Sequence, residues 1–228
     1  MTLQHVDILF QVIVFLFAIS IHESAHAWMA NRRGDPTAYM LGRVTLNPLK
    51  HIDPVGTILL PAIGLYYGGW IFGWAKPTPV NPSNFRRPVL DDVLTSVAGP
   101  ASNFILAFGA VAGLALISLS SSSGQEIVRG APFGATGSDS VLVPVARFLF
   151  QLLLINVVLA VFNLIPVPPL DGSHVFRHLL SGWLLMIYDR IGIFGLVMLV
   201  ALDSRIHLLS RLFSPFLRFL WGLVLRFR

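Results

Sequence analysis

The sequence predicts an all-α polytopic membrane protein with about four to six transmembrane helices and one re-entrant segment. Of its 228 residues, 55% are hydrophobic and only 12% are charged, whereas a soluble domain carries about 25% charged residues. The mean hydropathy is +0.74. Apolar stretches close to the roughly 20 residues needed to cross a bilayer recur along the chain. Together these observations predict a membrane domain and leave little chain for a soluble one.

The charge balance and the absence of cysteine exclude several classes of function. The formal net charge is +5, which we interpret as cytoplasmic loops facing anionic lipid, because no basic and aromatic surface pattern indicates nucleic-acid binding. The chain has no cysteine, so it has neither disulfides nor iron–sulfur clusters nor Cys-ligated zinc. Any metal ligands must therefore be His, Asp or Glu.

The first two apolar segments differ in length and flanks. Residues 7–30 form a span, and because no Lys or Arg precedes Arg32, we expect a retained helix and no cleaved signal peptide. Residues 57–72 contain Pro61 and lie between two basic clusters. A full crossing would place one cluster outside, so we expect this segment to be re-entrant from the cytoplasm.

The rest of the chain alternates spans and connections. Residues 94–119 form a second span, residues 120–141 an outer loop rich in Ser and Gly, and residues 142–165 a third span. Arg147, near the outer end of the third span, is expected to snorkel to the headgroups. The N-terminus is then outside, while residues 31–92 and 171–190 face the cytoplasm.

The C-terminal end leaves two alternatives open. Residues 191–202 begin a further span, and the following residues space arginines among apolar residues. They fit either an interfacial amphipathic helix or another crossing. We expect one membrane-embedded domain over residues 1–228, with its core in residues 7–190 and C-terminal helices of undetermined topology in residues 191–228.

The first span contains the sequence HESAH, with His22, Glu23 and His26 inside an apolar helix. Residues four apart lie on the same helix face, so the two imidazoles converge. This H-E-x-x-H spacing is typical of two ligands to one zinc ion with the glutamate as general base. The alternative is ordinary polar residues facing a helix bundle. Ionisable groups at this depth usually face a cavity or a partner, so we favour the metal site, inside the bilayer but nearer its cytoplasmic face.

A third ligand is identified by elimination. The metzincin pattern fails because Met29 and Arg32 occupy the positions of its glycine and histidine. Glu126, the other glutamate, belongs to the outer loop. Asp171 remains: it follows the Pro-broken stretch NLIPVPPLDG, and irregular backbone at membrane depth is tolerated where it is buried or lines a cavity. The alternative is that Asp171 caps a helix beginning near Ser173.

These motifs resemble the site-2 protease family of intramembrane zinc metalloproteases. HESAH, SVAGPASN and NLIPVPPLDG occur in the family's order over roughly residues 10–180, while GRVTLNPLKHIDPVGT and GWAKPTPVNP resemble a compact prokaryotic branch without PDZ or CBS domains. The resemblance implies one Zn²⁺ held by His22, His26 and Asp171, with Glu23 as catalytic base. It also implies that Asn163 contacts substrate, and that a loop or β-hairpin around residues 69–82 is embedded on the cytoplasmic side.

The other polar residues carry open alternatives. Asn163 holds either the substrate or the carbonyls freed by Pro166. Asn103 is expected to support the metal ligands or helix packing. His51 and His174 are expected near the cytoplasmic mouth, at the surface or behind the ligands. The Pro-rich stretch GWAKPTPVNP offers an edge for pairing with an unwound substrate.

The leading hypothesis is an intramembrane zinc metalloendopeptidase of the cell membrane that hydrolyses peptide bonds within or near transmembrane segments, with its site toward the cytoplasm. The alternatives are a membrane zinc carrier and a non-catalytic relative that binds helices. A carrier needs ligands near the outer face, and a binding protein needs no base. Expected partners are a transmembrane protein substrate and the lipid bilayer, with no nucleic acid, and the sequence leaves homo-oligomers and adaptors undetermined.

Overall fold

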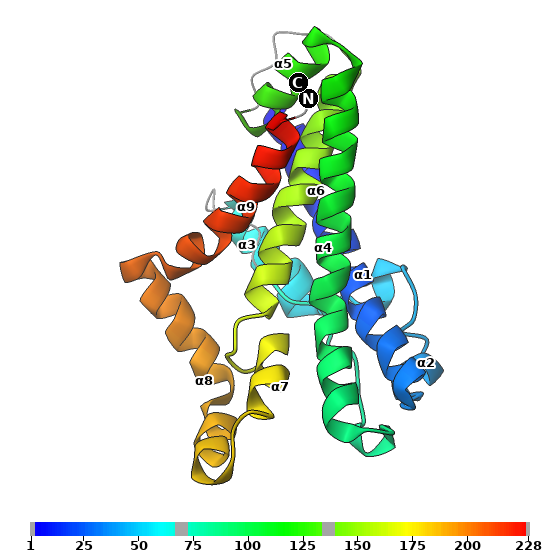
Figure 1. Ribbon diagram of the computed structural model, residues 1–228, viewed down its shortest axis with the longest axis vertical. Helices are drawn as coiled ribbons and strands as arrows, with labels where there is room; N and C mark the ends of the chain where they lie inside the picture. The colour runs from blue at the N-terminus through cyan, green and yellow to red at the C-terminus, as the bar shows by residue number, and fades with distance from the viewer. Residues whose placement is uncertain (1–2, 67–72, 134–139, 227–228) are drawn as a thin grey trace.

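The computed structural model describes residues 3–66, 73–133 and 140–226 (Figure 1). Over these residues the chain is helical with no strand, and four of the helices are long and apolar enough to cross a membrane. This confirms the predicted all-α membrane fold. The long helices are α1 (Leu3–Arg33), α4 (Pro88–Ser120), α6 (Leu142–Asn163), α8 (Gly182–Ile206) and α9 (Leu208–Arg226), and the short ones are α2 (Thr37–Met40), α3 (Leu60–Tyr66), α5 (Ser122–Gly130) and α7 (Asp171–Arg177).

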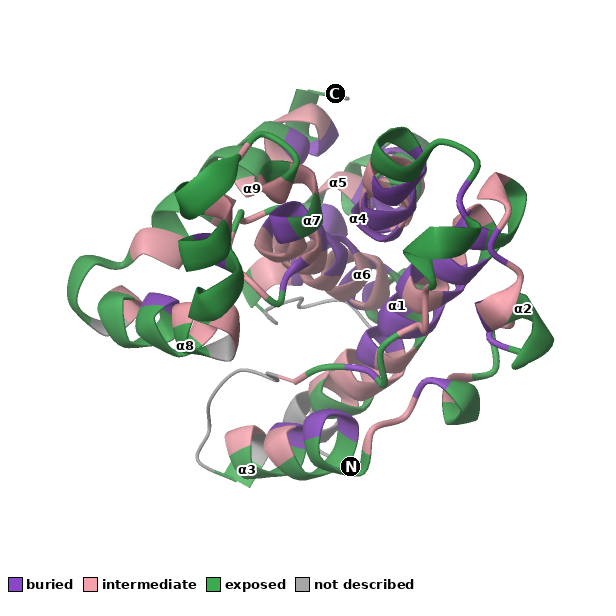
Figure 2. Cartoon of the chain, turned by 90° about the horizontal axis from the view of Figure 1, so that it is seen from below, coloured by how far each residue is buried: buried purple, intermediate pink, exposed green. Residues whose placement is uncertain are grey.

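Helices α1, α4 and α6 form the centre of the molecule, and their buried faces meet (Figure 2). The core is lined on α4 by small residues such as Ala107 and Ala110, both fully buried. Small side chains let transmembrane helices approach closely, which replaces the hydrophobic driving force that lipid does not supply. The C-terminal half of α9 completes this core with Leu220 and Val224.

Helix α4 begins earlier than the predicted span and continues through Gly99 and Pro100. Pro88 stands in its first turn, where a missing N–H costs nothing. The Asp91 carboxylate accepts a hydrogen bond from the Arg87 N–H at 2.7 Å. Inside the helix, the Ser102 hydroxyl donates to the Gly99 carbonyl at 2.7 Å. Pro100 cannot donate to the carbonyl four residues before it, and a packed transmembrane helix tolerates such a proline where its surroundings compensate.

The prediction that residues 120–141 form only a loop is wrong, because α5 lies within them. The Ser121 side chain accepts a hydrogen bond from the Gly124 N–H at 3.0 Å and so caps the helix. Ile127 and Val128 are buried against the bundle. Two apolar residues in a Ser- and Gly-rich stretch give a weak periodic signal, whereas tertiary packing of that face stabilises the helix.

The prediction that Arg147 snorkels to the headgroups is wrong. Its side chain is 7% exposed and pairs with the Asp7 carboxylate, so it joins α6 to α1 inside the bundle. A charged group at membrane depth is costly unless it is paired, and Asp7 removes the need to reach the headgroups. Its partner Asp7 is 140 residues away in sequence. The local sequence around Arg147 could not indicate this ion pair, and it predicted snorkelling to the headgroups instead.

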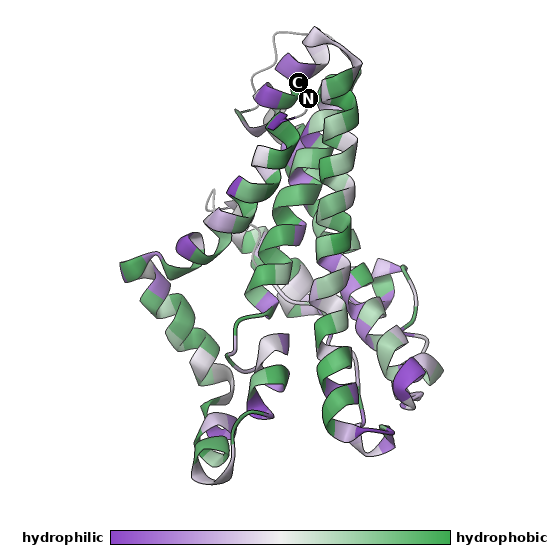
Figure 3. Ribbon diagram, viewed as in Figure 1, coloured by the Kyte–Doolittle hydropathy of each residue, from purple (hydrophilic) through white to green (hydrophobic). Residues whose placement is uncertain are grey.

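Residues 54–64 form a short apolar helix. The predicted re-entrant segment, residues 57–72, extends into residues 67–72, which lie outside the described residues, so re-entry stays a prediction. Helix α8 bends by 73° at Gly192, whose positive φ of 48° favours glycine. Helix α9 qualifies as a span by length and composition. Apolar residues dominate the upper parts of α4, α6 and α9, while polar residues gather at the ends (Figure 3).

Residues 73–84, which we name the strap, contact residues 51–57 and Glu23 of α1 before α4 begins. Over residues 73–81 the strap has no regular secondary structure, and Pro82–Asn84 form a single 3₁₀ turn. The expected loop or hairpin around residues 69–82 is therefore a loop in its described part, since residues 67–72 lie outside the described residues.

Asp35, just after α1, holds the end of the strap. Its fully buried carboxylate accepts hydrogen bonds from the Asn81 N–H at 2.7 Å, the Asn84 amide at 2.8 Å and the Thr37 hydroxyl at 2.5 Å. Burial alone would raise the pKa of Asp35, but these hydrogen bonds outweigh it and hold the pKa below its usual value. The charged form of Asp35 therefore stabilises the fold.

We predict that Asp35→Ala lowers the free energy of unfolding by about 1–3 kcal/mol at neutral pH, because it leaves several buried donors unpaired. Since the pKa of Asp35 is lower in the folded state, its contribution is complete above pH about 4 and is lost as pH falls below that. Thermal unfolding in detergent as a function of pH measures both effects. Asp189→Ala is the control, because Asp189 forms an exposed ion pair with Arg177 that contributes at most about 1 kcal/mol. Equal melting temperatures for the two variants would contradict the prediction.

Candidate metal centre

Helix α1 presents His22 and His26 on one face. Both are buried, and their Nε2 atoms lie 3.1 Å apart. The rings meet edge to face, with an interplanar angle of 82°. This arrangement follows from the i, i+4 spacing, which stacks the two side chains one helical turn apart.

Asp171 reaches the histidine pair from the start of α7. Its Oδ2 lies 3.1 Å from His22 Nε2 and 3.3 Å from His26 Nε2. The chain turns here because the prolines after α6 stop the helix. Gly172 then packs on the end of α6, where a Cβ would lie 2.3 Å from the Leu164 carbonyl oxygen. The close packing of Gly172 places the Asp171 carboxylate against α1. Asp171 is the first residue of α7 and does not cap a helix that starts near Ser173.

The three atoms fit the geometry of a zinc site. A tetrahedral zinc with nitrogen and oxygen ligands at 2.0–2.1 Å places neighbouring ligand atoms about 3.3–3.4 Å apart. The separations of 3.1, 3.1 and 3.3 Å are close to that edge length. Among the described residues, this is the one group of three or more His, Asp or Glu side chains with metal-ligand spacing.

A chain of hydrogen bonds fixes the proton on His22. The Asn156 amide donates to the Leu152 carbonyl at 2.8 Å, so its Oδ1 must accept from the Asn103 amide, also at 2.8 Å. Asn103 Oδ1 therefore faces His22 Nδ1 at 2.6 Å and can only accept. In the neutral imidazole the ring proton of His22 consequently sits on Nδ1, and Nε2 carries a lone pair.

His26 is fixed in the same tautomer by backbone. Its Nδ1 lies 2.7 Å from the Thr95 carbonyl oxygen, which can only accept. His26 Nε2 is therefore also a lone-pair atom, and the Asp171 Oδ2 that faces it is buried without a hydrogen-bond donor. With both rings neutral, three lone-pair atoms converge on one point. A metal cation makes this arrangement favourable, and outer oxygen partners on Nδ1 are the usual support of zinc-bound histidines.

Gly99 lets α4 approach these ligands. A Cβ on Gly99 would lie 2.3 Å from His26 Nε2 and 2.7 Å from His22 Nε2. No side chain fits there without displacing the imidazoles. The same helix carries Thr95 and Asn103, one turn to either side, so glycine at position 99 allows both acceptors to reach the histidines.

Glu23, between the two histidines in sequence, points toward the strap. Its Oε2 accepts hydrogen bonds from the Thr78 N–H at 2.8 Å and from the Thr78 hydroxyl at 2.7 Å. The carboxylate is half-buried, and its second oxygen remains to accept a proton. This arrangement suits a general base, which needs a fixed orientation and one free oxygen.

Three other predicted residues lie outside the ligand group. The Asn163 amide donates within its own helix to the Leu159 carbonyl at 3.0 Å. His51 is fully buried and bonds through Nε2 to the Thr45 carbonyl at 2.9 Å. His174 lies 3.6 Å from the Asp92 carboxylate, which also pairs with His178 at 2.7 Å. His174 and His178 thereby link α7, which carries Asp171, to α4.

The sequence alone missed several participants. Thr95 acts through its backbone carbonyl, which no residue type signals. Thr78 acts across 55 residues of sequence, and Asn156 acts through Asn103. Gly99 belongs to the motif SVAGPASN, where a glycine inside an apolar helix does mark a close approach.

The comparison with known families matches residues 10–202 to the model described as peptidase family M50. The chain belongs to peptidase family M50. This is the site-2 protease family that the motifs resemble. As an M50 member the chain is an intramembrane zinc metalloprotease, a hydrolase with zinc as its cofactor, and the carrier and helix-binding alternatives are not favoured.

Individual relatives agree with the family. The chain is 37% identical over 224 residues to "Putative zinc metalloprotease YwhC" of Bacillus subtilis (strain 168), covering 90% of this chain and 93% of the relative. It is 35% identical over 107 residues to "Putative zinc metalloprotease Rip2" of Mycolicibacterium smegmatis (strain ATCC 700084 / mc(2)155), covering 46% of this chain and 40% of that relative. No solved structure matches the chain significantly.

We predict that Gly99→Ala abolishes zinc binding, because the added Cβ occupies the space next to both Nε2 atoms. Zinc content per chain of the purified protein, measured by mass spectrometry, is the readout. Gly109→Ala in the same helix is the matched control, since a Cβ there meets nothing within 4 Å and zinc should remain near one per chain. Full zinc content in Gly99→Ala would contradict the geometry.

A second prediction concerns Asn103. Asn103→Leu removes the acceptor that holds the His22 proton on Nδ1, so we expect zinc affinity to fall by about 10- to 100-fold. Competition with a chelator measures the change. Asn163→Leu makes the same substitution where the amide bonds within its own helix, and its zinc affinity should stay that of the unmodified protein. Equal affinities for both variants would show that the tautomer does not depend on Asn103.

Proposed function

We propose that His22, His26 and Asp171 hold the catalytic zinc and that Glu23 is the general base of peptide hydrolysis. The observation that carries this proposal is the convergence of three lone-pair atoms, with both histidine protons committed to Asn103 and Thr95. Three protein ligands leave one position open, which is the arrangement of catalytic zinc sites.

The chain's own groups supply the proton transfers. Zinc, when bound, polarises the scissile carbonyl and lowers the pKa of water toward about 7. Glu23 accepts the proton of the attacking water at the carboxylate oxygen that Thr78 leaves free. Glu23 then delivers this proton to the leaving amide nitrogen, which restores the carboxylate for the next turnover. Burial of the ligands excludes bulk water and strengthens these interactions.

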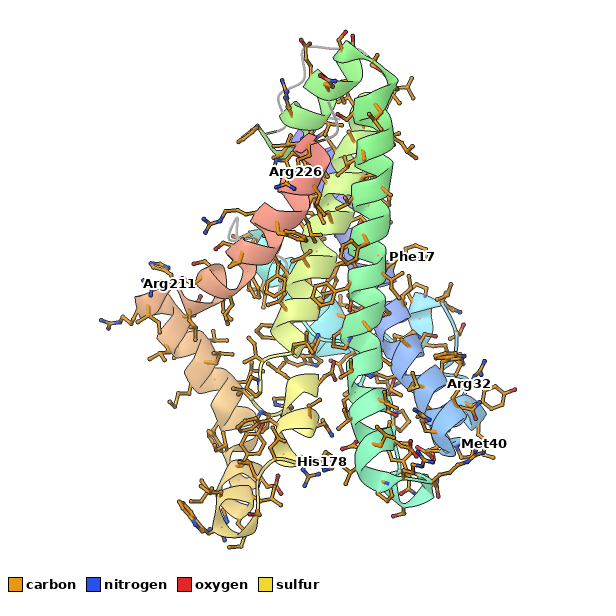
Figure 4. All side chains as sticks on the ribbon, viewed as in Figure 1. Phe17, Arg32, Met40, His178, Arg211 and Arg226 are labelled. Carbon is orange, nitrogen blue, oxygen red and sulfur yellow. The ribbon has the colours of Figure 1, made fainter. Side chains whose placement is uncertain are left out.

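We propose that the site faces the cytoplasm and that the protein lies in the cell membrane. Arg32 and His178 lie toward one end of the molecule and Arg226 toward the other (Figure 4). The strap and the segments before and after it carry more basic residues than residues 120–141, whose one basic residue is Arg129, which favours the cytoplasm for the strap side under the positive-inside tendency. The basic residues on the strap side are Arg32, Arg33, Arg43, Lys50, Lys76, Arg86 and Arg87. At 1.5 Å per residue, His26 then lies about 9 Å from Arg32, inside the bilayer.

The proposed substrate is a transmembrane segment of a membrane protein, cut within or near the bilayer. A helical segment shields its own peptide bonds, so it must unwind before a carbonyl reaches the zinc. We propose that Asn163, at the end of α6, contacts the unwound backbone through its side-chain oxygen, because its amide nitrogen is already bonded to Leu159. We also propose that residues 1–228 act as one membrane-embedded domain with its core in residues 7–190.

We predict that Glu23→Gln retains one zinc per chain and loses cleavage of a single-pass membrane substrate by about 100-fold or more, since it removes the base and keeps the ligands. The measurement pairs zinc content with cleavage in proteoliposomes. Glu126→Gln is the matched control, because Glu126 is the other glutamate of the chain and lies on α5; its cleavage rate should not change. Cleavage that survives Glu23→Gln would overturn the assignment of the base.

A further inference from the structure

The strap is fixed along its first half by hydrogen bonds to two backbone carbonyls and from one hydroxyl of residues 51–57. The Trp74 N–H donates to the Gly56 carbonyl at 3.2 Å, and the Lys76 N–H donates to the His51 carbonyl at 2.8 Å. The Thr57 hydroxyl donates to the Trp74 carbonyl at 2.8 Å. These three hydrogen bonds attach the strap to residues 51–57, although the strap itself has no regular secondary structure over residues 73–81.

Arg43 adds a buried cation to this attachment. Its guanidinium donates to the carbonyls of Lys76 at 3.0 Å and Pro77 at 2.7 Å, and also to the carbonyl of Lys50. Because Asp35 holds residues 81–84, the strap is fixed on both sides of residue 78. The position of Thr78 is therefore set by the fold and does not depend on Glu23.

Thr78 is the point where the strap contacts the proposed base. Both of its donors reach Glu23 Oε2, the N–H at 2.8 Å and the hydroxyl at 2.7 Å, and the hydroxyl also lies 3.0 Å from the Glu23 carbonyl. Hydrogen bonds to a charged acceptor are roughly twice as strong as neutral ones. Two of them on one oxygen restrain the orientation of the carboxylate.

The residues beside Thr78 limit what else this part of the strap can do. Pro77 and Pro79 have no N–H, and the N–H of Thr78 is already donated to Glu23. Residues 77–79 therefore offer an unwound substrate no free backbone donor. Edge pairing of a substrate with the strap, as the Pro-rich sequence led us to expect, has no donor at these three positions.

We propose that Thr78 is a positioning residue for the reaction: it orients the Glu23 carboxylate so that the second oxygen faces the attacking water. This inference rests on the proposed role of Glu23. Thr78 acts on the catalytic step through the base and does not hold the substrate. Its hydroxyl therefore contributes to kcat, whereas a residue of a substrate-binding edge would contribute to KM.

The test compares Thr78→Val, Thr78→Ser and Thr57→Val in proteoliposomes with a single-pass substrate. Thr78→Val keeps the shape and the N–H but removes the hydroxyl, so we expect kcat to fall by about 10- to 100-fold with KM and zinc content unchanged. Thr78→Ser restores the hydroxyl and should bring kcat back to within about threefold of the unmodified protein. Thr57→Val removes a hydroxyl that bonds the same strap without touching Glu23, and the remaining anchors should keep kcat within about threefold.

The outcomes separate this inference from the proposed function. If Glu23→Gln abolishes cleavage while Thr78→Val cleaves normally, or raises KM alone, the positioning role fails and the proposed base stands. If Thr57→Val and Thr78→Val lower kcat equally, the strap acts only as a structural support, which also overturns the inference. If Glu23→Gln still cleaves, the proposed function itself fails.

Discussion

The site depends on one electrostatic constraint: three lone-pair atoms are held within 3.3 Å of one another in a buried position. Such a group is repulsive unless a cation occupies it. Asn103 and the Thr95 carbonyl commit one ring proton of each histidine to Nδ1, which leaves both Nε2 atoms facing Asp171 as the nitrogens available to a metal. The hydrogen bonds to the two Nδ1 atoms therefore favour metal binding at the Nε2 atoms more than the three ligand residues would by themselves.

The helical bundle holds the hydrogen-bond partners of the two histidines in place. Helix α4 meets α1 at a glycine, and a chain of two asparagines continues the support of His22 to α6. A polar chain in a membrane interior is favourable only when every member is satisfied, and its end on the Leu152 carbonyl satisfies the last amide. The strap applies the same principle beside the histidine face of α1, where it holds the Glu23 carboxylate.

Local patterns in the sequence were enough for the parts of the structure that depend on periodicity. Apolar length predicted α1, α4 and α6, and the i, i+4 spacing predicted the convergence of His22 and His26. Asp171 was reached only by elimination, because its approach depends on the turn after α6. The carbonyl of Thr95 and the pairing of Arg147 with Asp7 carry no local signal. Contacts made by backbone, or across long stretches of chain, are decided by packing and cannot be deduced from spacing alone.

X-ray absorption at the zinc edge of the zinc-loaded protein tests the central claim most directly. The account predicts one zinc with two imidazole nitrogens near 2.0–2.1 Å, completed by oxygen ligands near 2.0–2.2 Å, and one imidazole fewer in His22→Ala if that variant retains zinc. A spectrum with three or more imidazoles would draw ligands from His174 or His178 and contradict the account. So would an unchanged imidazole count in His22→Ala.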